Sequence, residues 1–363
     1  MHSTFIRRGF LPEHDPVREF PHGSELAMLD DLGRDIPSLL QDPGFRQYAS
    51  RLKIPHWPDS ASRPETLGEL RLYYVRLGFL ASAYINQVWQ PRATVLPRNI
   101  AVPLCHACGL LNRPPILSYD GYALFNWKRF DPAGPIALGN IDTLQDFVHL
   151  YDEHWFILVH VEIEALAADI LAAIDRAAAA VSIDDRKEVN TALADLAGAV
   201  WRQVAVIKRI PEKMDPTLYY KTFRPYIRFF ENVVYEGVTD VPLDFRGETG
   251  AQSSIIPTLV AFMKIEHQQS ALTDHLADMQ RFMPAEHRAL IQEVWAMPSV
   301  RDLADKAIFN DILEAMATFR EVHFGWAHEY INKWVEDPRG TGGTPYMQWL
   351  KQLIDETRAH KIA

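Results

Sequence analysis

An alanine-rich stretch from His154 to Val181 constrains the fold more than any other part of the sequence. Its apolar residues recur at the three- and four-residue spacing of a helix face, and alanine has the highest helix propensity of all residues. Strand-like alternation is scarce elsewhere, so we predict an all-α fold. Further helices are expected at Thr66–Val88, Ser182–Ile210, Thr217–Phe230, Ser254–Phe282, Pro284–Met297 and Ala307–Val335.

Local signals predict some helix boundaries. Ser182 and Asp185 have the spacing of a capping box, which indicates that a helix begins there. Asp215 before Pro216 predicts an N-cap with proline at the first helical position. Pro225 lies inside the pattern that follows and is expected to kink that helix.

The N-terminal part of the chain differs in character. Residues 1–60 are rich in proline and charge and predict extended segments with a few short helices. Repeated prolines from Pro91 to Pro115 are expected to interrupt regular structure. We predict a small, mixed but mainly helical N-terminal domain with a linker over residues 1–142, and a large all-helical domain over residues 143–363.

Charge and composition exclude several classes of protein. Lys and Arg number 37 against 47 Asp and Glu, a net charge of −10, so nucleic acid is not an expected partner. The apolar runs fall far short of the roughly 20 residues of a membrane span, and no secretory signal is recognisable. Cys105 and Cys108 predict free thiols in a reducing cytoplasm, because a zinc ribbon needs a second cysteine pair.

The helix expected to end near Val335 carries the most informative candidate, His323. A haem iron takes an axial histidine from an apolar helix face, and haem propionates pair with arginine, which Arg320 supplies one turn earlier. The alternative is a hydrogen-bonded core histidine, the commoner role of a lone histidine on an apolar face. His328 lies on another side of the helix and is expected to be solvated. The apolar stripe around His323 consists of Met316, Phe319, Trp326, Ala327 and Tyr330.

A second histidine, His160, stands one helical turn before Glu164. Such a pair suits metal ligands or an acid–base couple. It equally suits a surface pair or a buried histidine held by a carboxylate, so the residues alone leave these alternatives open.

An arginine among aromatic residues is a further candidate. Arg224 follows Tyr219, Tyr220 and Phe223. An arginine in such a setting can clamp a carboxylate beside an apolar slot, or it can stack on a tyrosine at the surface.

Two glycine-bearing stretches, residues 247–254 and 339–344, lack the ending of a Walker A loop. The first leads into an expected helix N-terminus, where free N–H groups can meet an oxygen atom. The second precedes the last helix and is expected to be mobile.

Taken in order, several motifs resemble those of the indoleamine 2,3-dioxygenase family. The resemblance extends over residues 95–355 and implies a helical, haem-dependent enzyme. The matching segments are Leu96–Pro103 (LPRNIAVP), Pro114–Tyr119 (PPILSY), Asn126–Lys128 (NWK), Val234–Gly237 (VYEG), Gln252–Ser254 (QSS), Asp278–Arg288 and Gly340–Thr344.

This resemblance implies roles for particular residues. His323 falls on the proximal ligand of the haem b iron, and Arg320 falls on the arginine that pairs with the propionates. Arg224 falls on the arginine that binds the substrate carboxylate, and Thr341 on the mobile-loop threonine that helps to bind substrate. The other implied substrate-pocket positions are Tyr119, Phe156, Tyr219, Tyr220, Thr249 and Gly250.

The sequence departs from the family pattern in its pocket. Tyr219 and Tyr220 stand where phenylalanines are expected, and Thr249 stands in place of a serine. His160 falls on the family's distal serine, and its spacing from Phe156 is similar to the F-x-x-x-H pattern of the tryptophan 2,3-dioxygenases, whose distal residue is a histidine. We therefore interpret His160 as a catalytic distal residue that hydrogen-bonds the indole N–H or the bound oxygen.

The reaction implied by the resemblance is insertion of O2 across the indole C2–C3 bond of L-tryptophan or a related indoleamine. The product is N-formylkynurenine, which places the enzyme in tryptophan catabolism by the kynurenine pathway. Two alternatives remain open: a related haem enzyme that inserts one oxygen atom or acts on a modified indole, and a non-catalytic haem sensor. No oligomeric state is predicted.

Overall fold

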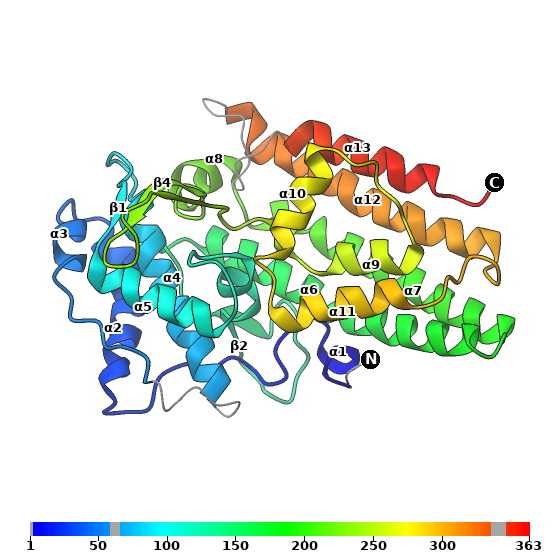
Figure 1. The fold of residues 1–363 in the computed structure, drawn as a ribbon, viewed down its shortest axis with the longest axis horizontal. Helices are drawn as coiled ribbons and strands as arrows, with labels where there is room; N and C mark the ends of the chain where they lie inside the picture. The colour runs from blue at the N-terminus through cyan, green and yellow to red at the C-terminus, as the bar shows by residue number, and fades with distance from the viewer. Residues whose placement is uncertain (1–2, 59–65, 335–345) are drawn as a thin grey trace.

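The computed structural model describes residues 3–58, 66–334 and 346–363. Helices account for most of these residues and the strands are short, which confirms the predicted all-α class. Long helices run side by side through one half of the molecule, and shorter helices with small strands occupy the other half (Figure 1). None of the described helices is long and apolar enough to cross a membrane.

The long helices pack against one another in sequence-distant pairs. α6 (Tyr151–Val181) lies along α7 (Arg186–Ile207). α12 (Lys306–Tyr330) packs against both α7 and α13 (Tyr346–Ala359). Shorter elements around them are α8 (Pro216–Leu218), α9 (Ile255–Met263), α10 (Ala271–Gln280), α11 (Ala285–Ala296), and the helical turns η5 (Ile210–Glu212), η6 (Tyr219–Phe223), η7 (Gly250–Gln252) and η8 (Asn332–Trp334).

The other half of the molecule contains shorter helices and two small sheets, one of which joins β1 of the N-terminal part to strands from later in the chain. β1 (Val95–Leu96) runs parallel to β4 (Phe230–Tyr235), with Val95 opposite Val234, and β5 (Leu243–Phe245) pairs antiparallel with β4. β2 (Trp127–Arg129) and β3 (Ile141–Thr143) form an antiparallel pair. The helical elements are α2 (Met28–Leu39), α3 (Phe45–Ala49), α4 (Leu67–Asn86), α5 (Arg98–Leu110), and the turns η1 (Glu25–Ala27) and η4 (Asp120–Leu124).

The first helix, α1 (Ser3–Arg8), packs on α6 instead of on its neighbours in sequence. The contact depends on Gly9, whose φ of +62° lies in the left-handed region. A Cβ atom there would stand 2.1 Å from the Glu164 carbonyl oxygen, so only glycine allows so close an approach.

Two hydrophobic cores meet along α6. The first gathers the N-terminal helices and strand β4, and the second lies among α6, α7, α9, α11 and α12. Phe156, in the first half of α6, packs against both cores. The first half of α6 is therefore fixed from both sides by buried apolar surface, the main source of folding free energy.

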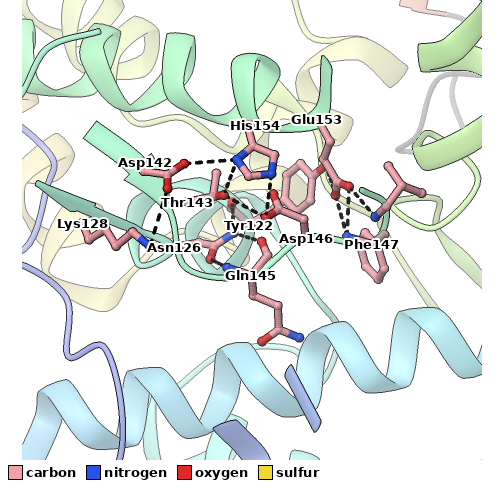
Figure 2. A network of polar contacts seen from close by, with 11 residues as sticks. Tyr122, Asn126, Lys128, Asp142, Thr143, Gln145, Asp146, Phe147, Glu153 and His154 are labelled. Atoms are coloured by element: carbon pink, nitrogen blue, oxygen red, sulfur yellow. Dashed lines mark hydrogen bonds and ion pairs between the residues drawn. The ribbon is translucent and has the colours of Figure 1, made fainter. Parts of the chain in front are cut away.

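A polar network fixes the start of α6 (Figure 2). The Glu153 carboxylate accepts hydrogen bonds from the backbone N–H groups of Phe147 (2.9 and 3.1 Å) and Val148 (2.9 Å) and from the Tyr122 hydroxyl (2.9 Å). The next residue, His154, lies 3.1 Å from an Asp142 oxygen. Hydrogen-bond donors thus reach both oxygens of the buried Glu153 carboxylate.

Several predicted boundaries are corrected by the structure. Asp185, not Ser182, is the N-cap of α7, because its carboxylate accepts from the Glu188 N–H at 3.0 Å. The Ser182 hydroxyl instead donates to the Ala178 carbonyl at the end of α6 (3.0 Å). Elsewhere α5 continues through Pro103, one of the prolines expected to interrupt regular structure, and loses only one backbone hydrogen-bond donor.

The segment predicted as one kinked helix over 217–230 divides into a short helix, a π turn and a strand. The predicted N-cap is confirmed, since the Asp215 carboxylate accepts from the N–H groups of Thr217 (2.8 Å) and Leu218 (3.0 Å). The helical turns end before Pro225, which has no N–H to continue them, and β4 follows.

The helix predicted over 254–282 is likewise two helices, α9 and α10. The break comes at Lys264, which adopts the left-handed conformation (φ 55°) at the end of α9. Glycine is the usual residue at such a helix end, so the sequence carries no signal for it.

Candidate active site

His323 lies on helix α12 beside residues of the second hydrophobic core. The side chain keeps the accessible surface of an exposed residue. Burial nevertheless lowers the pKa of His323 to about 4, and the neighbouring His160 lowers it further. An imidazole that is accessible yet surrounded by protein atoms leaves room for a ligand beside it. At neutral pH the ring is uncharged, the form that binds a metal ion.

Helix α6 brings His160 within electrostatic reach of His323. The Nδ1 atom of His160 lies 2.7 Å from the Phe156 carbonyl oxygen. A carbonyl can only accept a hydrogen bond, so Nδ1 carries the proton. Burial lowers the pKa of His160 and favours the neutral ring. Its other nitrogen, Nε2, is therefore a hydrogen-bond acceptor.

Aromatic rings form a wall beside His160. The Phe156 ring lies 4.6 Å from the His160 ring, 5.6 Å from Tyr219 and 6.1 Å from Phe223, measured between centroids. Tyr219 meets Tyr330 of α12 edge-on at 5.7 Å. The wall thus joins the helix that carries His160 to the helix that carries His323, and its apolar faces suit a flat aromatic ligand.

Two segments predicted to line the pocket form π turns. The Arg224 N–H donates to the Tyr219 carbonyl five residues earlier (3.1 Å), in η6. The Phe125 N–H does the same to the Asp120 carbonyl (2.8 Å), in η4, which Tyr119 immediately precedes. π turns are rare and occur frequently at functional sites, so their presence at both segments supports the predicted location.

Arg224 is a buried arginine, with 3% of its surface exposed. Its guanidinium lies over the Tyr220 ring at 5.1 Å. Tyr220 in turn stacks on Trp334. Arg224 does stack on a tyrosine, but not at the open surface, because the arginine is buried and Tyr220 is half-buried. In such surroundings the interaction of a guanidinium with a carboxylate is strengthened by the low local dielectric.

Tyr119 and Glu164 lie together behind His160. The Tyr119 hydroxyl donates to Glu164 Oε1 at 2.8 Å, and the Tyr119 ring meets the His160 ring edge-on at 5.9 Å. The Ser253 hydroxyl donates to the same carboxyl oxygen at 2.5 Å. His160 and Glu164 thus hydrogen-bond to different groups. Their four-residue spacing therefore does not mark a direct pair between them.

Thr249 and Gly250 lie at the turn before α9. The Thr249 hydroxyl accepts from the Ala251 N–H (3.4 Å) and caps η7. Gly250 is exposed, and a Cβ atom there would meet nothing within 4 Å. The turn is tied to the site through Gln252, whose side-chain oxygen accepts from the Tyr119 N–H at 2.9 Å.

Arg320 is buried one turn before His323 and interacts with α13. It donates to the Leu353 carbonyl (3.1 Å) and to the Thr357 hydroxyl. Burial lowers the pKa of Arg320 to about 10, which leaves it cationic at neutral pH. Its pairing with propionates stays a prediction. Thr341 lies outside the described residues.

These residues fit haem better than a metal ion bound by protein ligands alone. Within residues 3–58, 66–334 and 346–363, no group of three His, Cys, Asp or Glu side chains could hold a metal ion. Haem needs only one axial imidazole among apolar and aromatic neighbours, which His323 provides. Cys105 and Cys108 are free thiols, as predicted, and burial raises their pKa values to about 11 and about 12.

Two residues of this region, Glu248 and Ser253, were not predicted from the sequence. Glu248 is buried, and burial raises its pKa to about 8. Ser253 belongs to the Q-S-S motif, which was a usable signal, whereas no local pattern marks Glu248. Both lie on the segment between β5 and α9.

Comparison with known proteins gives one consistent result. The family model described as indoleamine 2,3-dioxygenase matches residues 3–335. Indoleamine 2,3-dioxygenase 1 of Mus musculus is 31% identical and that of Rattus norvegicus 30%, each alignment covering 96% of this chain and 92% of the relative. The 6-hydroxytryptophan 2,3-dioxygenase of Fusarium equiseti is 24% identical over 97% of this chain and 95% of its own length.

Proposed function

This chain belongs to the indoleamine 2,3-dioxygenase family, and on that premise we propose that it is a haem-dependent dioxygenase of L-tryptophan. The reaction breaks the indole C2–C3 bond and adds one oxygen atom of O2 to each carbon, giving N-formylkynurenine. Both oxygen atoms enter the product, so no further reductant is consumed. The observation that carries the proposal is the aromatic wall that joins the helix of His160 to the helix of His323.

His323 is the residue that would hold the iron of haem b, with Arg320 as the cation nearest to it along α12. Haem, when bound, supplies the activation of O2, and the protein supplies binding and orientation. The neutral imidazole of His323 and the apolar residues around it suit this role.

The substrate would be held mainly by Arg224 and the aromatic wall. The Arg224 guanidinium binds the amino-acid carboxylate, while Phe156 and Tyr119 flank the indole. Thr249 and the backbone at Gly250 would complete the pocket on its polar side, with the two tyrosines of η6, Tyr219 and Tyr220, beside it. The resemblance assigns Thr341 to substrate binding as well. Fixing the indole in one orientation lowers the entropic part of the barrier.

His160 accepts a hydrogen bond in this proposal. Its Nδ1 proton is engaged by the Phe156 carbonyl, so Nε2 has a lone pair and no proton to donate. The indole N–H is a donor and O2 is not. The tautomer therefore favours contact with the indole N–H over contact with oxygen, and His160 orients the ring to be oxidised.

The test is the mass of the product formed by the reduced, haem-loaded protein from L-tryptophan and O2. A product heavier by two oxygen atoms is expected. A product heavier by one oxygen atom would instead establish the monooxygenase alternative, and haem binding without turnover of any indole would establish a sensor.

A modified indole is the second candidate substrate, and the hydroxyl groups of Tyr219 and Tyr220 favour it. Both tyrosines stand where phenylalanines are expected, and a relative is named for 6-hydroxytryptophan. A hydroxylated tryptophan with a higher kcat/KM than L-tryptophan would support this candidate. The free thiols of Cys105 and Cys108 agree with a reducing compartment, and we place the enzyme in the cytoplasm.

A further inference from the structure

Glu164 is a completely buried carboxyl group in the middle of α6. One of its oxygens, Oε1, accepts the hydroxyl groups of Tyr119 (2.8 Å) and Ser253 (2.5 Å). Its other oxygen, Oε2, is buried and has no hydrogen-bond partner within the described part of the chain. Such an arrangement is costly for an ionised carboxylate, because a buried charged oxygen needs donors of its own.

Glu164 joins three segments that come from distant parts of the sequence. Tyr119 follows the P-P-I-L motif, and Ser253 stands just before α9. The Tyr119 ring meets His160 edge-on, and its backbone N–H is held by Gln252. A change at the Glu164 carboxyl would therefore move the ring beside His160 and the turn that carries Thr249.

Burial disfavours the ionisation of Glu164, and the hydroxyl groups that bond to it oppose this effect only in part. Burial raises the pKa of Glu164 to about 7, although the Ser253 and Tyr119 hydroxyls lower it in part. Tyr119 is neutral, since burial and the neighbouring Glu164 raise the pKa of its phenol. The segment just after α1 contacts the backbone of Glu164, where the Phe10 N–H donates to the Glu164 carbonyl (3.4 Å).

We propose that Glu164 is a positioning residue of the substrate pocket, which acts through Tyr119 and Ser253 without touching the substrate. It holds the Tyr119 ring against His160 and fixes the turn before α9 at one distance from α6. This inference rests on the proposed function, because it assigns Glu164 to the pocket that would bind the indole. A carboxylic acid suits the task, since one oxygen can accept two hydroxyl groups while the group stays uncharged.

The experiment compares haem-loaded variants by L-tryptophan binding as well as by turnover. The dissociation constant is measured from the change in the haem absorption band as L-tryptophan is added to the ferric protein. Glu164→Leu removes both hydrogen bonds and is expected to weaken L-tryptophan binding about 10- to 100-fold, with a parallel loss of kcat/KM. Glu164→Gln keeps an accepting oxygen and is expected to stay within about threefold of the wild type.

Glu162→Gln is the matched control, because Glu162 lies on the same helix and accepts the Leu138 N–H at 2.8 Å. It removes one carboxyl group away from the pocket and should leave binding and turnover unchanged. Combining Glu164→Leu with Tyr119→Phe should be no worse than Glu164→Leu alone, because the two residues act as a unit. If Glu164→Leu does not fold, Glu164→Asp withdraws the carboxyl from both hydroxyls and should show the same weaker binding.

Unchanged L-tryptophan binding per bound haem in Glu164→Leu, or in Glu164→Asp where the leucine variant does not fold, would overturn the inference and leave Glu164 a structural residue. Fully additive effects of the Glu164 and Tyr119 variants would overturn it too. Failure of the proposed function is distinguishable, because it would show as a wild-type protein that forms no oxygenated product. The binding measurement on the variants stays informative in that case.

Discussion

Two buried glutamates on α6 show how one helix serves two purposes. Glu153, at its N-terminal end, and Glu164, three turns further on, both have 0% of their surface exposed. Glu153 receives donors on both carboxyl oxygens, mostly from backbone N–H groups (Figure 2). Glu164 receives side-chain hydroxyls on one oxygen alone.

This difference in hydrogen-bond donors distinguishes Glu153, a structural anchor, from Glu164, a residue of the candidate site. Backbone donors at Glu153 fix the path of the chain before α6, and the many hydrogen bonds offset the cost of burial. At Glu164 the donors are side chains that can move, and they belong to segments that carry predicted pocket residues. We infer that the first turn of α6 serves stability and that its middle serves the reaction.

The largest expected effect is the loss of haem binding when His323 is replaced. Replacing His323 with alanine should abolish stable haem binding, because it removes the one imidazole that α12 presents from its apolar face. Haem content per chain, measured by absorption after reconstitution, is the readout. His328→Ala, on an exposed face of the same helix, should bind haem normally. A His323→Ala protein with full haem content and an unchanged spectrum would remove His323 as the ligand.

The second effect concerns substrate alone. Arg224→Ala should lower kcat/KM for L-tryptophan by roughly 30-fold or more while haem content stays intact. The reason is that a lost buried charge contact costs on the order of 2–5 kcal/mol. Arg228→Ala serves as the control, since Arg228 lies four residues further on and stacks on Phe229. Equal kcat/KM in the Arg224 variant and the wild type would show that Arg224 is structural.

Much of the fold could be predicted because its signals are local. The periodicity of α4, α6 and α12 lies within single segments, so their positions were predicted to within a few residues. The strand β4 was missed because it forms through pairing with β1, whose residues lie far away in sequence. The left-handed end of α9 at Lys264 was missed because lysine gives no signal for it.

The residues of the candidate site were also predictable only where their signals are local. His323 and Arg224 could be selected from the residues around them, since an apolar stripe and an aromatic cluster are visible in one segment. The surroundings of Glu164 could not, because Tyr119 and Ser253 lie 45 and 89 residues away from it. Its spacing from His160 pointed to a pair, whereas the tertiary contacts give each side chain a different partner.

If Glu153 is a structural anchor, its replacement should lower stability without lowering the catalytic rate. Glu153→Ala should lower the free energy of unfolding by about 3–5 kcal/mol, because it leaves the N–H groups of Phe147 and Val148 and the Tyr122 hydroxyl without their acceptor. Denaturant unfolding measures this change. Among folded molecules, kcat per bound haem should match the wild type. A stable variant with impaired turnover would reverse the roles assigned to the two glutamates.

The smallest effect is a pH dependence of stability that belongs to Glu164. Its pKa is raised to about 7 in the folded protein, against 4.5 for the free side chain. Between these values the folded chain binds one proton that the unfolded chain has released, so the wild type loses stability as pH rises from about 4.5 to 7. The loss is at most about 3.5 kcal/mol, at about 1.4 kcal/mol per pH unit. Glu164→Gln lacks this proton and should show a flatter profile in denaturant titrations across that range, whereas Glu162→Gln should keep the wild-type slope. Identical slopes in the wild type and Glu164→Gln would mean that Glu164 is ionised in the folded protein, and that the two glutamates of α6 differ less than their hydrogen bonds indicate.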